Sequence, residues 1–534
     1  MPDYDSGRPD DMPGYASGRT KHMPRTATQV APNDYRGPMR RRVSCAEDDR
    51  VTEIIPGLYM SPLEFTALLG AVAVVAARWL PSAARPCLTT AAGAVFVLSA
   101  LALSVAGTRW QMLPVLTGAV LALPFAVSPL LRRRSGRPAR RARWWLALPG
   151  STACIGLIAT GPVAAWAFPV PAFPEPSGDF AVGTRVVQWT DPRRPESFTA
   201  DPHDRRTVVV QLWYPAQSSP AGTQRAPYLG RTEHEGRIVA DALARYAGLP
   251  GFLVDGVPRA RSHSVFDAPV AGEGERFPVV LFSPGAGGVR TQNTAWAEEL
   301  ASHGYVVAAL DHPYDSAAVV LTDGRTINTE LTSTGDQDKD DELAAGWTAV
   351  RAADLSFVLT RLEQLGRGEI TDPLTGHLDA DRVAVTGHSM GGAAALQAAR
   401  QGRRFGAVID LDGYPHGPLS PSLHQPTLAL TQAITPETDP RYIPRLTKAI
   451  KLNTATSYRL TVPGAAHLTF MDGPLYLPPV PSMVGSLGRT ESPRTVAVPT
   501  LAFLDATLRN KPGDLAGLLS AHGDLNVHHP GNGR

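Results

Sequence analysis

A predicted strand, a sharp turn and a predicted helix meet at residues 383–392, and this segment constrains the fold more than any other. Its sequence, VAVTGHSMGG, has alternating apolar residues before Gly387 and is followed by a run of small residues with a helical pattern. The motif G-x-S-x-G at such a junction is typical of a nucleophile elbow, in which glycines allow a tight turn beneath a strained serine. Ser389 is therefore the candidate nucleophile, and the alternative is an ordinary turn serine.

Short apolar segments alternate with helical patterns on both sides of this turn. Strands are predicted at 205–215, 277–283, 304–311, 383–385, 406–412 and 426–430, and helices at 293–303 and 340–365. Strands that are apolar throughout are typical of a parallel sheet covered by helices on both faces. The sequence therefore predicts an α/β fold with a doubly wound, mostly parallel sheet. Segment 228–264 interrupts the alternation and could form a cap over the site.

Four long apolar runs precede this domain, at about 63–80, 87–107, 112–131 and 144–170. A bilayer core needs about 20 apolar residues per helix, and tryptophans fall near the ends of these runs, as interfacial aromatics do. We interpret residues 59–170 as a unit of four transmembrane helices. The alternative is a buried helical bundle of a soluble protein, but soluble helices normally carry a polar stripe.

The distribution of arginines predicts an orientation for these helices. The loop 132–143, RRRSGRPARRAR, separates the third and fourth runs, and short arginine-rich loops beside membrane helices stay in the cytoplasm. The fourth helix would then lead outward, so we expect a multi-pass cell membrane protein whose catalytic domain is extracytoplasmic. The arginines at 40–42 argue mildly against an external N-terminal tail, and a translation start at Met60 would remove that conflict.

Composition divides the rest of the chain. Residues 1–58 are rich in proline, glycine and charged residues and are expected to be a disordered tail, 171–179 a proline-rich linker, 180–520 the catalytic domain and 521–534 a second disordered tail. The formal net charge of +2 gives no general argument for nucleic-acid binding. The three cysteines all precede residue 155, so the catalytic domain can form no disulfide of its own, and they do not indicate a compartment.

A nucleophilic serine needs a base and an acid that orients the base, and in this architecture they follow it in the order Ser, Asp or Glu, His. The histidines after Ser389 are His416, His424, His467, His522, His528 and His529, and the candidate acids are Asp410, Asp412, Glu437 and Asp439. His467 is preferred as the base because it follows a strand-like segment, 457–462, and a Pro-Gly turn. Asp410 and Asp412 share one face of a strand, and Asp412 is nearer the end that should reach the site.

The reaction also needs donors for a developing oxyanion. The glycine-rich segment SPGAGGV at 283–289 follows a predicted strand, so its backbone N–H groups could approach such an oxygen. Ala286 is the best donor in this loop, and the residue after the nucleophile, Met390, supplies the second N–H in this architecture. The alternative for the loop is an ordinary glycine-rich turn.

Six segments of the chain resemble one known family, in the order in which that family has them. They are LWYPA at 212–216, FPVVLFSPGAGGVR at 277–290, LASHGYVVAALDH at 300–312, GHSMGG at 387–392, IDLDGYP at 409–415 and GAAHLTF at 464–470. Together they resemble the plasma-type platelet-activating-factor acetylhydrolases. The resemblance implies an α/β-hydrolase fold and a Ca²⁺-independent serine esterase that releases short or oxidised acyl chains from phospholipids. It also implies Ser389 as nucleophile, Asp412 as acid, His467 as base, and Ala286 and Met390 as oxyanion donors.

Two residues depart from the family pattern. Pro284 stands where the family usually has histidine in the oxyanion loop, and Met390 replaces a larger aromatic residue. Both border the expected acyl site, so the acyl group that this chain accepts is expected to differ from the family's. The four apolar runs lie outside the resemblance.

We therefore expect a membrane-anchored serine ester hydrolase that acts on a small-molecule or lipid ester through an acyl-enzyme, with no cofactor and no metal. The pairs Asp311–His312 and His528–His529 lack the further ligands that a catalytic metal needs. One alternative is a general carboxylesterase or polyesterase, in which the acid often follows a later strand and would be Glu437 or Asp439. A second alternative, from a different class, is a membrane sensor whose hydrolase-like domain only binds.

Overall fold

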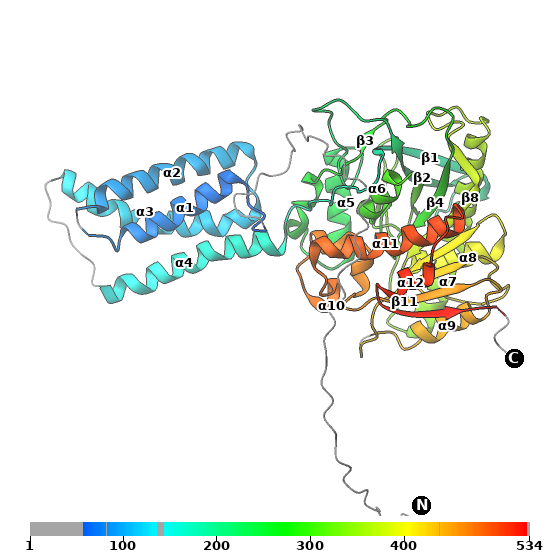
Figure 1. Ribbon diagram of the computed structural model, residues 1–534. Helices are drawn as coiled ribbons and strands as arrows, with labels where there is room; N and C mark the ends of the chain where they lie inside the picture. The colour runs from blue at the N-terminus through cyan, green and yellow to red at the C-terminus, as the bar shows by residue number, and fades with distance from the viewer. Residues whose placement is uncertain (1–56, 82, 136–143, 437, 531–534) are drawn as a thin grey trace, which may run out of the picture. The chain divides into compact units, whose positions relative to one another are not determined.

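The computed structural model describes residues 57–81, 83–135, 144–436 and 438–530. The predicted N-terminal tail therefore lies almost wholly outside the described residues, as does most of the arginine-rich loop between the third and fourth apolar runs. Figure 1 shows the two kinds of structure in the described chain, a set of long helices near the N-terminus and a twisted sheet with helices in the remainder.

Four helices form at the four apolar runs, namely α1 (Pro62–Ala77), α2 (Arg85–Ala106), α3 (Leu113–Arg134) and α4 (Trp144–Ala167), with a 3₁₀ turn, η1 (Trp110–Met112), before α3. Glycines let these helices approach closely, since a Cβ on Gly70 would lie 3.0 Å from the backbone of Phe96 and one on Gly118 would lie 2.9 Å from a carbonyl oxygen of α4. Many of their large apolar side chains are nevertheless exposed, such as Leu98 and Phe125.

Three of these apolar segments, Arg85–Ala106, Trp110–Arg132 and Ala147–Ala167, are long and apolar enough to cross a membrane, by length and composition only. Helix α1 is apolar but has 16 residues, fewer than the other three. It begins with a capping box, in which Ser61 Oγ accepts from the Glu64 N–H at 3.2 Å and Glu64 accepts from the Ser61 N–H at 2.9 Å.

The sheet has ten strands in the order β12-β11-β10-β9-β8-β4-β5-β2-β1-β3. Its central strands, β4 (Phe277–Ser283), β5 (Val306–Asp311), β8 (Leu378–His388), β9 (Ala407–Leu411), β10 (Thr427–Thr431) and β11 (Ser457–Thr461), are all parallel. Strands β1 (Ala181–Pro195) and β2 (Arg205–Ala216) join antiparallel at one side, where β3 (Val265–Phe266) pairs parallel with β1. The prediction of a mostly parallel α/β sheet is confirmed, and the arrangement is consistent with an α/β-hydrolase fold.

Helices cover both faces of the sheet, as the wholly apolar strands predict (Figure 1). Helices α7 (Gln337–Gly366), α8 (Met390–Gln401) and α9 (Tyr442–Lys451) pack on one face, against side chains such as Val279 and Leu281. Helices α6 (Thr294–Ser302), α11 (Gly488–Leu508) and α12 (Leu515–Ser520) pack on the other, against Val280 and Phe282. Alternate residues of one strand therefore supply two separate hydrophobic cores, and the loops at the carboxyl ends of the strands are left free for a site.

Segment 228–264 contains α5 (Glu233–Tyr246) and two 3₁₀ turns, η2 (Gly251–Val254) and η3 (Val257–Arg259). It has a small core of its own, in which Leu229, Val239 and Val257 pack together with Val289, the last residue of the glycine-rich loop. This core attaches the segment to the loop that carries the expected oxyanion donor. A separate hairpin, β6 (Ala318–Val320) with β7 (Thr326–Asn328), follows β5.

The interpretation of residues 521–534 as a disordered tail is wrong for part of the segment. Residues Asp524–His528 form β12, the edge strand, which pairs antiparallel with β11. The polar composition concealed this strand because an edge strand is stabilised by main-chain hydrogen bonds and needs few buried side chains. Its central residues, Leu525 and Val527, are half-buried. Residues 531–534 lie outside the described part of the chain.

Candidate active site

Ser389 lies at a strained turn between β8 and α8. Its backbone has φ of 55° and ψ of −122°, a conformation that non-glycine residues rarely adopt. The residues two positions before and after it must be glycines. A Cβ on Gly387 would lie 2.1 Å from the backbone of Gly391, and one on Gly391 would lie 2.0 Å from the Ser283 carbonyl oxygen. The local sequence thus forces the serine into the cleft at the end of the strand, as the motif predicts.

His467 and Asp412 are joined by a hydrogen bond between Nδ1 and Oδ2 at 2.6 Å. His467 begins a 3₁₀ turn, η4 (His467–Phe470), shortly after β11, and its side chain is 40% exposed, whereas that of Asp412 is fully buried. Asp412 directly follows β9 in a left-handed conformation, with φ of 57°. Its other oxygen accepts from the Tyr442 hydroxyl at 2.6 Å and from the Gln432 N–H at 2.7 Å. These donors hold the carboxylate in a fixed orientation toward the imidazole.

Asp410 occupies a different place on the same strand. Its Oδ1 accepts from the Gly413 N–H at 3.0 Å, and a Cβ on Gly392 would lie 1.9 Å from that oxygen, so the carboxyl is packed against the start of α8. Burial, and then the nearby charge of Asp412, raise the pKa of Asp410 well above its ordinary value. The carboxyl is therefore engaged at the start of α8, and no hydrogen bond joins it to His467 among the described residues.

Asp439, one of the two later candidate acids, has partners other than His467. Asp439 accepts from the Tyr414 hydroxyl at 2.6 Å and is paired with Arg441, and it has no hydrogen bond to His467. Glu437 lies outside the described residues. Among the other histidines, His416 pairs with Asp341 and His424 with Thr454, while His528 belongs to β12. The structure therefore brings one histidine and one acid together in the way the sequence predicts.

Two cavities, each with a volume of about 310 Å³, meet at Ser389. The first is mainly apolar, and its lining includes Leu229, Leu243, Ala244, Leu249, Val254, Val257, Leu468 and Leu477 together with Ser389 and His467. The second is more polar, and Tyr414, His416, Gln432 and Asp439 line it with the same serine and histidine. No hydrogen bond joins the Ser389 hydroxyl to His467 among the described residues, and such bonds are often longer without substrate. An ester could place its two sides in these two spaces.

Ala286 lines both cavities and Met390 the second. The backbone N–H of Ala286 has no hydrogen-bond partner in the described part of the chain. Met390 is the first residue of α8, where N–H groups lack intrahelical acceptors and the helix dipole favours a negative charge. Both N–H groups are thus suited to an oxyanion beside Ser389.

Two buried residues at the site escaped the sequence interpretation, His388 and Gln292. Gln292 donates from Nε2 to His388 Nδ1 at 2.9 Å and accepts at Oε1 from the Gly285 N–H at 3.1 Å. His388 Nε2 donates to the His467 carbonyl at 3.0 Å, and burial lowers the pKa of His388 to about 3. This neutral imidazole connects the glycine-rich loop to the backbone of the candidate base. Its position inside G-x-S-x-G is variable in the motif, so the sequence offered no signal for this role.

No group of three or more His, Cys, Asp or Glu side chains that could hold a metal ion occurs within residues 57–530, leaving aside the short stretches that are not described. Asp311 is paired with Arg290, and His312 bonds Asp354 at 2.8 Å. Both side chains of this pair are therefore engaged with other residues of the protein. The chemistry that the described groups support is acyl transfer through Ser389.

Comparisons with known proteins point to the same chemistry. Residues 167–512 match the family model described as platelet-activating factor acetylhydrolase, isoform II. A protein of Arthroderma benhamiae named "Probable 1-alkyl-2-acetylglycerophosphocholine esterase" is 28% identical over 248 residues, which cover 45% of this chain and 58% of the relative. The platelet-activating factor acetylhydrolase of Canis lupus familiaris is 30% identical over 159 residues, covering 26% of this chain and 36% of the relative. These matches thus span a third to somewhat over half of the relatives' lengths.

Among solved structures, the ferulic acid esterase from Streptomyces cinnamoneus is similar to this chain with a TM-score of 0.54 and 30% identity. The similarity covers 67% of this chain and 99% of the esterase. The long N-terminal helices, except for the last residue of α4, lie outside the residues that the family model matches.

Proposed function

Because the chain belongs to the platelet-activating factor acetylhydrolase isoform II family, we propose that it is a serine ester hydrolase with Ser389, His467 and Asp412 as its catalytic triad. The observation that carries this proposal is the 2.6 Å hydrogen bond between His467 Nδ1 and Asp412, in a cavity that Ser389 also lines. An imidazole oriented by a buried carboxylate beside a serine in a strained turn is the arrangement that acyl transfer requires.

The proposed reaction has two steps. His467 Nε2 takes the proton of the Ser389 hydroxyl as Oγ attacks the ester carbonyl, and the Ala286 and Met390 N–H groups stabilise the resulting oxyanion. As the C–O bond of the ester breaks, the imidazolium returns the proton to the leaving alcohol. Water, deprotonated by His467, then attacks the acyl-enzyme and releases the carboxylic acid. Asp412 holds the imidazole tautomer that has a proton on Nδ1.

The apolar cavity indicates which part of the ester it receives. Its lining by leucines and valines suits an aliphatic acyl chain, and its volume of about 310 Å³ favours a short or modified one. The polar cavity on the other side of Ser389 suits the alcohol portion. Phospholipid sn-2 esters with short acyl groups fit both spaces, and the names of the fungal and canine relatives support this substrate class.

A second candidate is a general carboxylesterase or polyesterase. The observation that favours it is the similarity to the ferulic acid esterase, which extends over 99% of that protein. The polar cavity lined by Tyr414 could then accept a range of alcohols, and the two candidates differ in which esters are turned over fastest.

We also propose that helices α1 to α4 anchor the enzyme in the cell membrane, with the catalytic domain outside the cytoplasm. The support is the length and hydropathy of three of the helices and the exposure of many of their apolar side chains. The arginine cluster between α3 and α4 supports the orientation. Residues 228–264 would act as a cap over the apolar cavity.

Covalent labelling tests the nucleophile. The full-length chain in detergent should react with a fluorophosphonate, and Ser389→Ala should abolish the labelling while leaving the thermal unfolding transition in place. Labelling of the alanine variant at the wild-type rate would contradict the assignment of Ser389. If the wild type is neither labelled nor active on any p-nitrophenyl ester, a binding domain would be favoured instead. A screen of phospholipids with short and long sn-2 chains beside simple esters would separate the two candidate substrate classes.

A further inference from the structure

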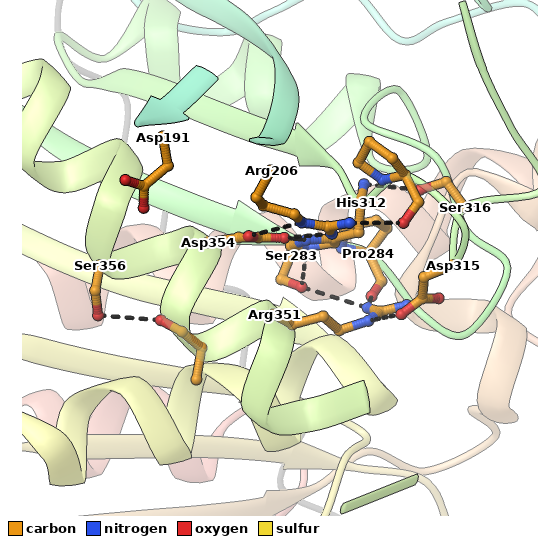
Figure 2. A network of polar contacts seen from close by, with 12 residues as sticks. Asp191, Arg206, Ser283, Pro284, His312, Asp315, Ser316, Arg351, Asp354 and Ser356 are labelled. Carbon is orange, nitrogen blue, oxygen red and sulfur yellow. Dashed lines mark hydrogen bonds and ion pairs between the residues drawn. The ribbon is translucent and has the colours of Figure 1, made fainter. Parts of the chain in front are cut away.

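A buried guanidinium lies directly beneath the glycine-rich loop. Arg351 of α7 is fully buried, and its charge is balanced by Asp315, which is also buried and lies in the turn after β5. Figure 2 shows Arg351 between Asp315 and the backbone of Pro284. Nothing in the catalytic steps described above uses this ion pair.

All five N–H donors of Arg351 have acceptors. Nε and one N–H of Nη2 donate to Asp315, and the other N–H of Nη2 donates to the Gly285 carbonyl at 2.9 Å. Nη1 donates to the Pro284 carbonyl and, at 3.4 Å, to the Ser283 hydroxyl. The guanidinium therefore donates hydrogen bonds to two successive carbonyl groups of the loop. Its planar set of N–H donors allows this geometry, whereas the ammonium group of a lysine would not.

The second of these carbonyls has a direct connection to the oxyanion site. The Gly285 carbonyl and the Ala286 N–H belong to the same peptide group, and this group is planar and trans, so the two bonds point in opposite directions. By holding the carbonyl oxygen on the buried side, Arg351 directs the Ala286 N–H toward the cavity that Ser389 lines. A positive charge at the carbonyl oxygen also polarises the amide and strengthens its N–H as a donor.

The loop needs such a restraint because its sequence is permissive. Gly285, Gly287 and Gly288 can adopt conformations closed to other residues, and Gly287 has φ of +66°. Two further hydrogen bonds restrain the peptide groups on either side of Gly285. The Gly288 N–H donates to the Gly285 carbonyl at 2.9 Å, and Gln292 accepts from the Gly285 N–H. Among the described side chains, Arg351 is the one that donates hydrogen bonds to both the Pro284 and the Gly285 carbonyls.

A second buried layer holds Ser283, the residue that begins the loop. The Ser283 hydroxyl bonds His312 Nε2 at 2.9 Å, and His312 Nδ1 bonds Asp354 at 2.8 Å. Burial lowers the pKa of His312, and its Nδ1 faces the Asp354 carboxylate, which can only accept. Ser283, His312 and Asp354 are connected like a Ser-His-Asp triad, but all three are fully buried and cannot contact substrate. The layer extends to Arg206, which donates to Asp354 at 2.7 Å (Figure 2).

We propose that Arg351, held by Asp315, is a positioning residue that orients the Ala286 N–H as an oxyanion donor. The inference rests on the proposed function, because it assumes that Ser389 is the nucleophile and Ala286 a donor. Loss of the anchor should weaken binding of the transition state far more than binding of the substrate, so kcat should fall and KM should change little.

The test compares the double variant Arg351→Met/Asp315→Asn, which leaves no unpaired buried charge, with Arg351→Lys and with Arg400→Met. Arg400 is the matched control, because its buried guanidinium also donates to a backbone carbonyl, that of Pro418 at 3.0 Å, but contacts no residue of the loop. Each full-length variant in detergent is assayed with p-nitrophenyl acetate, titrated for active sites with a fluorophosphonate, and tested with a trifluoromethyl ketone, which forms a tetrahedral adduct. Thermal unfolding measures the structural cost separately.

We expect kcat of the double variant to fall on the order of 10²–10³-fold, which is the effect of removing one oxyanion donor. Its affinity for the ketone should fall in parallel, whereas its KM should stay within about threefold of the wild-type value. Arg351→Lys should lose less, and Arg400→Met should keep kcat within about threefold whatever its thermal stability. A folded variant of Arg351 with wild-type kcat and ketone affinity would overturn the inference, as would an equal kcat loss in Arg400→Met. If the double variant does not fold, Arg351→Lys decides by the same criterion. Absence of Ser389-dependent labelling in the wild type would instead overturn the proposed function.

Discussion

Two aspartates two positions apart on one strand have opposite surroundings. Asp412, just beyond the end of β9, accepts three hydrogen bonds, from His467, Tyr442 and Gln432. Asp410, inside the strand, has one hydrogen bond and a raised pKa caused first by burial. Both aspartates share one face of the strand, but only side chains at its carboxyl end can reach a shared site. Position along the strand therefore makes Asp412 the candidate acid.

Substitution of the candidate acids separates the proposed triad from its alternative. Asp412→Asn should reduce kcat by about 10⁴-fold, because an amide at this position favours the wrong imidazole tautomer, and Asp439→Asn should leave kcat within about threefold. Steady-state kinetics on p-nitrophenyl acetate measures both. The reverse ranking of the two variants would place the acid after β10 instead.

His388 predicts a pH dependence of stability. Its pKa in the folded chain is about 3, mainly because of burial, whereas an unfolded histidine titrates near 6.5. Between these values the unfolded chain binds one more proton, so the contribution of the neutral imidazole is complete above pH 6.5 and is lost as the pH falls toward 3.

The variant His388→Gln should therefore lose less stability in acid than the wild type. Each pH unit below 6.5 costs the wild type about 1.4 kcal/mol through this group, so its advantage over the variant should shrink by about 2 kcal/mol between pH 6.5 and 5. Denaturant unfolding of both proteins across this range gives the difference. A difference independent of pH would mean that His388 titrates normally in the folded chain.

At the level of elements, α5 and the turns after it decide the shape of the apolar cavity. The sheet and the elbow supply the chemistry, while Leu243, Ala244 and Leu249 form part of the cavity wall. These residues come from the segment that interrupts the strand-helix alternation, which is attached to the glycine-rich loop through the small core around Val257. Acyl preference should therefore change with α5 while the catalytic step does not.

Enlarging a side chain on this helix should shorten the accepted acyl chain. With Leu243→Phe we expect the activity on p-nitrophenyl octanoate to fall by about tenfold or more relative to that on p-nitrophenyl acetate, because one or two methylenes contribute about 1–3 kcal/mol in an apolar pocket. The control is Arg237→Ala, an exposed position of the same helix that contacts Glu233 and does not line the cavity. An unchanged ratio in Leu243→Phe would assign the acyl chain to the polar cavity.

At the scale of the whole molecule, the chain combines long apolar helices with an esterase domain that contains no cysteine. In the proposed membrane-anchored arrangement, the domain has no disulfide-forming residues that would indicate its side of the membrane. Orientation depends on the arginine cluster, which is the feature that positive-inside topology follows.

Cysteine accessibility tests the orientation. After replacement of the three native cysteines by serine, Arg325→Cys in the exposed β6–β7 turn should react with a membrane-impermeant maleimide on intact cells. Ser135→Cys, exposed after α3, should react only after the cells are opened. The opposite pattern would place the catalytic domain in the cytoplasm.

The central strands, the elbow and the chain order of the candidate triad were predictable from the sequence, because glycine spacing and wholly apolar strands act through local sterics and burial. It also predicted the four apolar helices within a few residues. Folding of the whole domain was needed to bring Asp412 to His467, to pair β12 with β11, and to place Arg351 and His388 in contact with backbone carbonyls around the site. These contacts join residues up to 79 positions apart. A buried ion pair or a polar edge strand has no periodicity in the sequence that would reveal it.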